Sequence, residues 1–378
     1  MSITKHLTTG AARLAGGLLL LLGSGVVWAD YALNFQRPVT QIAKEQYDLH
    51  MLIFWICVVI FVLVFGVMFY SVFMHRKSKG HQAAHFHEST TIEVVWTVIP
   101  FIILVGMAIP STATLLKMED TSDADLTVKA TGYQWKWQYE YMDQGVSFFS
   151  TLSTPRDQIE NAADKGENYL IEVDNHVVLP VGKKVRLLIT ANDVIHAWWV
   201  PQLGVKKDAI PGFINEMWTR IEEPGIYRGQ CAELCGKDHG FMPIVVEAVT
   251  EDRFNAWIEE QKQMVASAAE AADKEWTQDD LIAHGQKVYQ ASCAACHGAE
   301  GKGVPNVFPA LTGSAITTGP LADHLDIVMN GKAGTAMQAF AAQLNDLDIA
   351  AVVTFERNGL GNSVGDMVQP AAVKDLRK

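Results

Sequence analysis

The chain contains the stretch Cys231-Ala-Glu-Leu-Cys235-Gly-Lys-Asp-His239-Gly-Phe-Met242, which brings two thiols, an imidazole and a thioether into twelve residues. Thiolate and thioether sulfurs are soft ligands that favour copper, whereas imidazole binds copper or zinc. Because Cys231 and Cys235 are four residues apart, a compact loop can turn both sulfurs towards one point. The pattern therefore predicts a metal site in which sulfur ligands favour copper.

Two strand-like segments flank this loop. One runs from Gly225 to Gln230, and the other runs from Pro243 to Val249. Pro243 suits the first position of a strand, because no donor to the ladder is needed there. We therefore predict that the ligands lie on a loop between two strands, so that a rigid sheet holds the site.

A second imidazole lies upstream. His196 follows the alternating segment Lys184 to Thr190, and we predict that it lies at the end of that strand. Two Cys, two His and one Met exceed the ligands of a blue-copper centre, which are two His and one Cys with a weak axial Met. The surplus thiolate suggests two coppers bridged by two sulfurs. A structural zinc site is the alternative, but it leaves Met242 unexplained.

The same residues carry a resemblance to a known family. The run from Gln230 to Met242, with Asp193-Val-Ile-His196 and Gly132 to Tyr141 before it, resembles subunit II of cytochrome c oxidase. The resemblance extends from about Tyr47 to Trp257. It implies a cupredoxin fold, a Greek-key β-sandwich, that holds the dinuclear copper centre called CuA.

The resemblance also implies roles for individual residues. Glu233 would hold a magnesium or manganese ion through its side chain, at the boundary with subunit I. Trp135 would be the surface point at which electrons arrive, although its alternation with Trp137 also fits ordinary core packing. The implied ligands of CuA are His196, Cys231, Cys235, His239, Met242 and the backbone carbonyl of Glu233.

The first 120 residues have the pattern of an exported membrane protein. Residues 1–29 carry Lys5 and Arg13 before an apolar run, which predicts a secretory signal cleaved after Ala29. An uncleaved membrane helix is the alternative. Residues 30–120 predict a transmembrane hairpin with helices at about 49–74 and 92–116, each long enough for the roughly 20 residues of a bilayer crossing.

The charges between the two helices set the orientation of the hairpin. Arg76, Lys77 and Lys79 follow the first helix directly and mark the cytoplasmic side. Glu93 lies at the cytoplasmic edge of the second helix, where it is either an interfacial anchor or part of a proton path. The resemblance implies the second role, at the entrance of the K proton channel of subunit I.

Apolar and polar residues alternate from about Asp123, which predicts an all-β domain over residues 121–255. A helix from Arg253 to Ala272 is predicted to follow, and residues 256–276 would form a helix and a linker. Besides the two strands around the loop, the predicted strands are Leu126–Ala130, Tyr133–Tyr141, Tyr169–Val173, Lys184–Thr190 and Ile214–Ile221.

Residues 277–374 are predicted to form an all-α class I cytochrome c domain. Cys293-Ala-Ala-Cys296-His297 is a signature of covalent heme attachment. The two thiols would bond to the heme, and His297 would be the proximal iron ligand. A thioredoxin-like redox pair is the alternative, but that motif needs a βαβ context and no following His.

A methionine opposite the histidine is expected, because it raises the potential of an electron carrier. Met337 lies in a loop after a predicted helix and resembles the ligand of the family. Met329 would lie within that helix and pack in the core. The family commonly places Pro after this Met, whereas Gln338 stands here.

These features predict a multi-domain membrane protein with a two-helix transmembrane hairpin, an all-β cupredoxin-like Greek-key domain and an all-α class I cytochrome c domain. By resemblance, it is subunit II of a respiratory terminal oxidase. It would accept electrons from cytochrome c through its own heme c and CuA. It would then pass them to subunit I, where oxygen is reduced to water with proton translocation.

The resemblance also implies the partners and the location. Partners would be subunit I, subunit III, a soluble or membrane-bound cytochrome c and membrane lipid. The location would be the bacterial inner membrane, with CuA and heme c in the periplasm. A formal charge of −12 argues against a nucleic-acid partner and suits a basic protein. Alternatives are a quinol-oxidase subunit II, which lacks the CuA ligands, a copper chaperone, and a standalone electron carrier.

Overall fold

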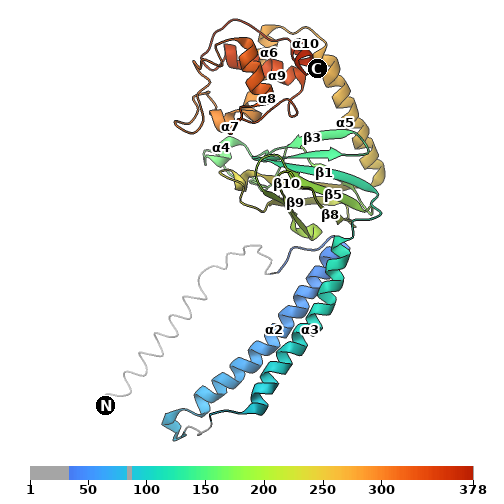
Figure 1. Ribbon diagram of the computed structural model, residues 1–378, viewed down its shortest axis with the longest axis vertical. Helices are drawn as coiled ribbons and strands as arrows, with labels where there is room; N and C mark the ends of the chain where they lie inside the picture. The colour runs from blue at the N-terminus through green and yellow to red at the C-terminus, as the bar shows by residue number, and fades with distance from the viewer. Residues whose placement is uncertain (1–33, 83–86, 378) are drawn as a thin grey trace, which may run out of the picture. The chain divides into compact units, whose positions relative to one another are not determined.

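The structure is a computed structural model that describes residues 34–82 and 87–377. The predicted signal peptide, residues 1–29, lies outside the described residues. Figure 1 shows, in chain order, a pair of long helices, a β-sandwich and a helical domain. This order agrees with the predicted fold class.

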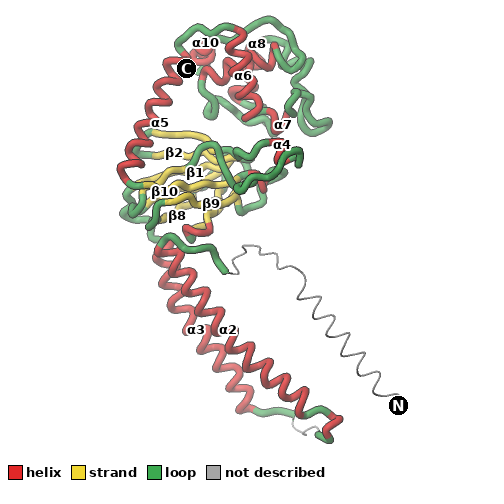
Figure 2. Tube along the Cα trace, turned by 180° about the vertical axis from the view of Figure 1, so that it is seen from behind, coloured by secondary structure: helices red, strands yellow, loops and turns green. Residues whose placement is uncertain are grey.

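The first part is a helical hairpin. Helix α2 spans Gln41–Met74 and α3 spans Thr90–Glu119, with a short 3-10 helix, Lys77–Lys79, after the first. Both helices are long and apolar enough to cross a membrane, and they lie side by side in Figures 1 and 2. Helix α2 begins before the predicted position 49, because the Thr40 hydroxyl accepts the Ala43 N–H at 3.0 Å and caps it.

The second part is a sandwich of two five-stranded sheets, ordered β3-β2-β1-β5-β8 and β4-β10-β9-β6-β7. Neighbouring strands are often distant in sequence, as Greek-key connections require. The strands are β1 Leu126–Tyr133, β2 Lys136–Tyr141, β3 Val146–Ser150, β4 Val177–Pro180, β5 Val185–Ala191, β6 His196–Val200, β7 Val205–Ala209, β8 Asn215–Thr219, β9 Gly225–Cys231 and β10 Pro243–Val249.

Alternation along the strands builds the core of the sandwich. Val128, Leu187 and Ile189 point inward from β1 and β5 and are fully buried. Burying a side chain of this size contributes about 1.5–3 kcal/mol. Trp198 is also fully buried, and its indole N–H donates to the Tyr139 hydroxyl at 3.1 Å. The aromatic core is therefore hydrogen-bonded as well as packed.

Two predicted strands are wrong. Tyr133–Tyr141 is not one strand, because β1 ends at Tyr133, residues 134 and 135 turn, and β2 returns antiparallel to β1. Tyr169–Val173 is mostly turn. Leu170 has a φ of 63°, and its N–H donates to the Thr154 hydroxyl at 3.0 Å instead of to a neighbouring strand.

Helix α5, Glu251–Ala272, begins inside the predicted β domain, before its boundary at residue 255. The Thr250 hydroxyl caps it by accepting the Arg253 N–H at 3.4 Å. Phe254, Trp257 and Ile258 from its first turns belong to the core of the sandwich. The start of this helix is therefore a structural part of the β domain.

The third part is a bundle of short helices: α6 Gln278–Ser292, α7 Ala294–His297, α8 Leu321–Asn330, α9 Asp346–Asn358 and α10 Pro370–Leu376. Helices α6 and α9 cross at Gly285, where a Cβ atom would lie 2.0 Å from the Ala351 carbonyl oxygen. Only glycine permits this approach. The crossing fixes the frame that carries the predicted heme motif.

Candidate functional site

The cysteine-rich loop connects two paired strands, as predicted. β9 ends at Cys231, and β10 begins at Pro243 and runs antiparallel to it. The Cys231 N–H donates to the Met242 carbonyl at 3.0 Å. This bond closes the loop at its base, so that residues from both of its ends lie together. Between them, a short 3-10 helix, His239–Phe241, carries the second histidine.

Two thiols form the centre of the cluster. The Sγ atoms of Cys231 and Cys235 are 3.8 Å apart, and both residues are buried as free cysteines. An imidazole lies next to each sulfur. His196 Nδ1 is 3.9 Å from the Cys231 sulfur, and His239 Nδ1 is 3.5 Å from the Cys235 sulfur. His196, from a distant segment, therefore meets the three predicted side chains of the loop at one place.

The remaining predicted ligands lie on the same loop. The Glu233 backbone carbonyl is 3.4 Å from the Cys231 sulfur, and Met242 is 1% exposed. The Glu233 side chain, in contrast, is on the exposed surface of the loop. The carbonyl and the carboxylate of this residue thus face different surroundings.

Asp193 orients His196, a role that the sequence did not single out. The ring Nε2 of His196 lies 2.9 Å from a carboxylate oxygen of Asp193, which leaves Nδ1 facing the sulfur. Metal-binding histidines commonly use the other ring nitrogen in this way. The second oxygen of Asp193 accepts the Gln134 N–H at 2.8 Å. Asp193 therefore joins the β1–β2 turn to the cluster.

His196 also corrects a prediction. It does not end the strand that begins near Lys184, because β5 ends at Ala191 and His196 is the first residue of β6. Burial disfavours the charged imidazole, but hydrogen bonds to Asp193 and Cys231 outweigh it and raise the pKa of His196. Burial by itself raises the pKa of Asp193, because it disfavours the charged carboxylate. The hydrogen bond with His196 lowers this pKa, and the net shift is downward.

The two thiols titrate as a pair. The hydrogen bond from Cys235 lowers the pKa of Cys231 well below the ordinary thiol value, and the His196 hydrogen bond adds to the effect. The same contact with Cys231, together with burial, raises the pKa of Cys235. Thiolate is the form that binds metal. The contact between the two sulfurs thus favours the thiolate form at Cys231.

The donor set fits the predicted pair of coppers. Two facing sulfurs, one imidazole on each, a carbonyl oxygen and a buried thioether match soft ligands for copper. A zinc site would use two Cys and two His. Such a zinc site would give no ligand role to Met242, although this residue is completely buried.

The residues of the heme motif lie together in one helical turn. His297 lies at the end of α7, and its Nδ1 is 2.9 Å from the Pro309 carbonyl oxygen. This contact leaves Nε2 available for iron, as outer partners of ligating histidines generally do. Cys293 and Cys296 are free thiols in the same turn. The chemistry of these residues fits a covalently held heme.

The two methionine candidates have different surroundings. Met329 lies within α8, is 5% exposed and belongs to the core of the cytochrome domain. Met337 is half-buried in the loop after α8, where it packs against the edge of that core. The loop position leaves Met337 freer to turn its sulfur towards iron.

Trp135 lies in the turn between β1 and β2. Its indole N–H donates to the Cys235 carbonyl at 3.2 Å, and the ring is half-buried. Trp137 is fully buried in β2, with its ring centroid 6.0 Å from that of His196. Because Trp135 precedes the strand, the alternation that paired it with Trp137 does not apply. Trp135 packs against the edge of the sandwich core, and a direct hydrogen bond also ties it to the cysteine loop.

Glu93 lies in the exposed first turn of α3. Its N–H donates to the Ser89 carbonyl at 3.0 Å. An acidic residue at a helix N-terminus also gains from the helix dipole, so the anchoring role remains an alternative to the proton path.

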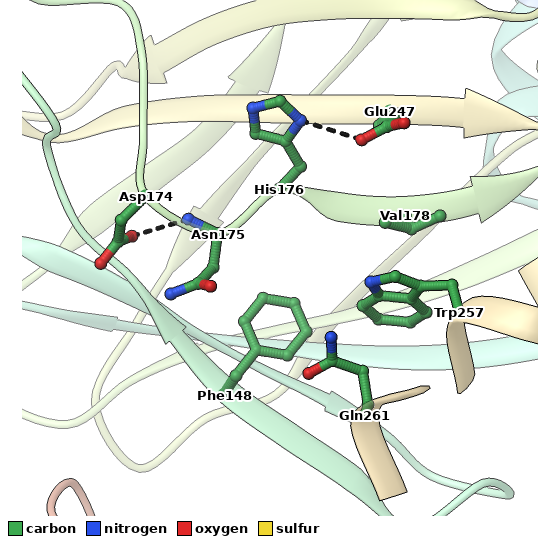
Figure 3. Close-up of a pocket in the computed structure, with 8 residues that line it drawn as sticks. All are labelled: Phe148, Asp174, Asn175, His176, Val178, Glu247, Trp257 and Gln261. Carbon is green, nitrogen blue, oxygen red and sulfur yellow. Dashed lines mark hydrogen bonds and ion pairs between the residues drawn. The ribbon is translucent and has the colours of Figure 1, made fainter. Parts of the chain in front are cut away.

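A cavity of about 230 Å³ lies apart from these residues, between the sandwich and α5. Figure 3 shows His176 next to Glu247, whose carboxylate oxygen is 3.0 Å from Nδ1 of the ring. The other ring nitrogen is 3.0 Å from a carboxylate oxygen of Glu172, which lies outside the figure. None of the predicted site residues lines this cavity. We therefore take the cysteine cluster as the candidate site. The lining residues are Phe148, Asp174, Asn175, His176, Val178, Glu247, Trp257 and Gln261.

Three family models match successive parts of the chain. Residues 28–114 match the transmembrane domain of cytochrome c oxidase subunit II, and residues 126–249 match its periplasmic domain. Residues 280–355 match subunit III of cbb3-type cytochrome c oxidase. The chain is thus a membrane protein whose C-terminal domains lie outside the cytoplasm.

Similar proteins agree with these matches. A probable cytochrome c oxidase subunit 2 of Rickettsia bellii is 39% identical over 63% of this chain and 87% of its own length. The subunit 2 of Cyanidium caldarium is 39% identical over 61% of this chain and 90% of its own length.

Among solved structures, the periplasmic domain of subunit II from Bradyrhizobium japonicum is 44% identical. It covers 38% of this chain and 98% of its own, with a TM-score of 0.35. With the family matches and the cysteine cluster in view, the chain belongs to the cytochrome c oxidase subunit 2 family and carries a C-terminal cytochrome c domain as well.

Proposed function

We propose that electrons reach this subunit from a cytochrome c, pass through its own cytochrome domain and then its CuA domain, and continue to subunit I. There oxygen is reduced to water with proton translocation. The observation that carries the proposal is the buried meeting of His196, Cys231 and Cys235, whose ligand atoms all lie within 4.8 Å of one another. When bound, copper and heme iron supply reversible one-electron redox chemistry.

Separate sets of residues hold the copper pair and the heme in this proposal. We assign the copper pair to His196, Cys231, Cys235, His239, Met242 and the Glu233 carbonyl, and the heme to Cys293, Cys296, His297 and Met337. Asp193 keeps the His196 ring turned towards the sulfurs. The Pro309 carbonyl does the same for His297. Both histidines are thus positioned before a metal arrives.

We propose that the exposed Glu233 side chain holds magnesium or manganese at the boundary with subunit I. Its side chain is exposed, and oxygen ligands suit these hard cations. Metal analysis of the purified complex before and after Glu233→Gln checks this assignment. A loss of magnesium or manganese with unchanged copper supports it, and equal contents of both ions in the two proteins contradict it.

The remaining assignments concern the surroundings of the chain. We propose that it lies in a bacterial inner membrane, with residues 121–255 and 277–374 in the periplasm and subunits I and III beside the hairpin.

We also assign Glu93 to the entrance of a proton path in subunit I. Glu93→Gln is expected to slow oxygen reduction in the complex while electron arrival at the CuA domain stays unchanged.

Met337→Ala should leave the heme covalently attached, because Cys293 and Cys296 remain. It should abolish the weak sulfur-to-iron absorption band near the red end of the spectrum, because the axial thioether is gone. Optical spectra of the oxidised protein measure this loss. Met329→Ala is the matched control, since it changes a core residue of the preceding helix. Loss of the band in Met329→Ala alone would reverse the assignment.

Purification of the intact complex from membranes tests the whole proposal. We expect this chain to co-purify with a large heme-bearing membrane subunit. After a light-triggered pulse of electrons, the absorption bands should show that heme c is reduced before CuA. The hemes of the partner subunit should be reduced after both. A chain that purifies alone and reduces no partner would instead be a standalone carrier.

A further inference from the structure

Side chains around the β1–β2 turn contact the loop that carries Met337. The Lys136 ammonium donates a hydrogen bond to the side-chain oxygen of Gln343. The Gln338 side-chain amide donates to the Gln134 backbone carbonyl at 3.4 Å. These residues are about two hundred positions apart in sequence, so the contacts link the CuA domain to the cytochrome domain.

Lys136 also lies against two aromatic rings. Its ammonium is 5.0 Å from the centre of the Phe149 ring and 5.3 Å from the centre of the Phe340 ring. One ring belongs to β3 of the sandwich, and the other belongs to the loop after Met337. An ammonium over a ring face gains cation–π energy, and partial burial strengthens the interaction. A single charge therefore holds aromatic groups from both domains.

The glutamines on the cytochrome side are held in place. The Gln343 side-chain amide donates to the Gln338 side-chain oxygen at 3.1 Å and to the Ala339 carbonyl at 2.6 Å. The Gln343 oxygen is then free to accept from Lys136. Because both glutamines belong to one network, losing Lys136 would also loosen the contact that Gln338 makes.

The same contacts lead to the cysteine cluster. Gln338 follows the proposed iron ligand Met337 directly in the chain, and its amide reaches Gln134. The Gln134 side chain in turn donates to the Cys235 carbonyl at 2.8 Å. Bonds and hydrogen bonds therefore run from one proposed metal ligand to the other. The Trp135 indole donates to that same carbonyl.

We propose that Gln134, Lys136, Gln338 and Gln343 form a docking seat that holds the fused cytochrome domain over the β1–β2 turn, with Lys136 as its positioning residue. The seat rests on the proposed electron route and specifies where the two domains meet. In each transfer, one electron leaves the ferrous heme, which becomes ferric, and reduces the oxidised copper pair. No proton or further reactant takes part.

The charge of Lys136 gives the seat a pH dependence. Burial lowers the pKa of Lys136 to about 8, while Cys293, Asp193, Asp174 and Cys296 act to raise it. Once the heme is attached, the two cysteines are thioethers without charge, so only the aspartates still raise the pKa of Lys136, which is lowered further. At a pH below this lowered pKa the lysine is charged and the seat is intact. As pH rises through that value, the ammonium and its cation–π contacts are lost, and transfer between the domains should slow.

The test uses the purified oxidase and follows flash-induced electron transfer from heme c to CuA between pH 6 and 10. Lys136→Met keeps the length of the side chain and removes its charge. We expect transfer at pH 7 to slow by up to about tenfold, the order of effect of one such contact on docking. We also expect the variant to lose the decline of the transfer rate at high pH. Lys136→Arg, which stays charged, should keep transfer fast across this range.

Lys129→Met is the matched control. Lys129 lies on the same hairpin and pairs with Glu140 at 2.7 Å, so it makes an ion pair that is not part of the seat. Its transfer rate and pH profile should equal those of the unchanged protein. Gln343→Ala removes the acceptor from the cytochrome side and should slow transfer in the same direction as Lys136→Met.

Two results would overturn the docking seat while leaving the proposed function intact. One is fast transfer in Lys136→Met with the ordinary pH profile. The other is slow transfer that keeps the decline at high pH, which would mean that the charge is not what positions the domain. If heme c and CuA exchange no electrons even in the unchanged protein, the proposed function itself fails, and the two failures are thereby distinguished.

Discussion

Cys231→Ser should abolish copper binding while leaving the heme iron in place. The unchanged protein is expected to hold two coppers and one iron in this chain. Cys231 faces both Cys235 and His196, and the Glu233 carbonyl also lies next to its sulfur. Serine offers no soft thiolate, so the substitution removes one of the two thiolates that would hold the copper pair.

The heme should survive because its residues belong to another core. Cys293, Cys296 and His297 lie on or beside α7, and none of them packs in the sandwich. Elemental analysis of the isolated complex gives the total copper and iron. Subtracting the metals of the partner subunit leaves the number of each metal held by this chain. Optical spectroscopy should show the CuA bands lost and the heme c bands kept.

Cys57→Ser is the control for this experiment. Cys57 lies on an exposed face of α2, far from the loop in sequence, and it is also a free cysteine. Its replacement should change neither metal. One zinc and no copper in the unchanged chain would contradict the dinuclear assignment, as would two coppers retained after Cys231→Ser.

Trp135→Ala should slow electron transfer from heme c to CuA and leave both metal spectra intact. Its indole N–H donates to the Cys235 carbonyl, so the ring is hydrogen-bonded to the backbone of a proposed copper ligand. The neighbouring Gln134 and Lys136 contact the cytochrome domain. Removing the indole therefore removes an aromatic contact between the copper loop and the turn that meets the cytochrome domain.

The covalent connection of the domains sharpens this expectation. A linker raises the local concentration of the cytochrome domain to roughly millimolar, so encounter is not the slow step. A higher concentration of external donor cytochrome should therefore fail to restore the rate, because the lesion lies after heme c. Flash-induced transfer within the purified oxidase, followed at the heme c and CuA bands, measures it.

Trp135→Phe distinguishes the contribution of the aromatic ring from that of the hydrogen bond, since it keeps an aromatic group and loses the indole N–H. An intermediate rate is expected. An unchanged rate in Trp135→Ala would mean that the ring serves only in packing. Trp137 is unsuitable for this comparison, because replacing a fully buried Trp by Ala costs about 3–5 kcal/mol.

The cluster and the heme motif are largely readable from local sequence. Cys231, Cys235, His239 and Met242 lie on one short loop, and strands on both sides fix its ends. The C-x-x-C-H motif and the two long apolar segments are likewise complete within short windows of sequence. Chemistry set by residues close together in the chain needs no knowledge of the fold.

The placement of His196 and Trp135 depended on the tertiary structure. Alternation predicted one strand through Trp135, but the chain turns there because β1 and β2 pair with each other. Alternation also placed His196 at the end of a strand, whereas it begins β6 and takes its orientation from Asp193. The pattern of apolar residues gives a period, but it does not say where a strand ends.

The sequence by itself determined which ligand types are present and that three structural parts follow one another. Only the tertiary structure brought His196 within 3.9 Å of Cys231 and Lys136 against Gln343. Spacing within a loop or a helical turn is set by local backbone geometry, so it can be read from the chain. Contacts between distant segments depend on how sheets pair and cores pack, because those interactions decide which side chains meet.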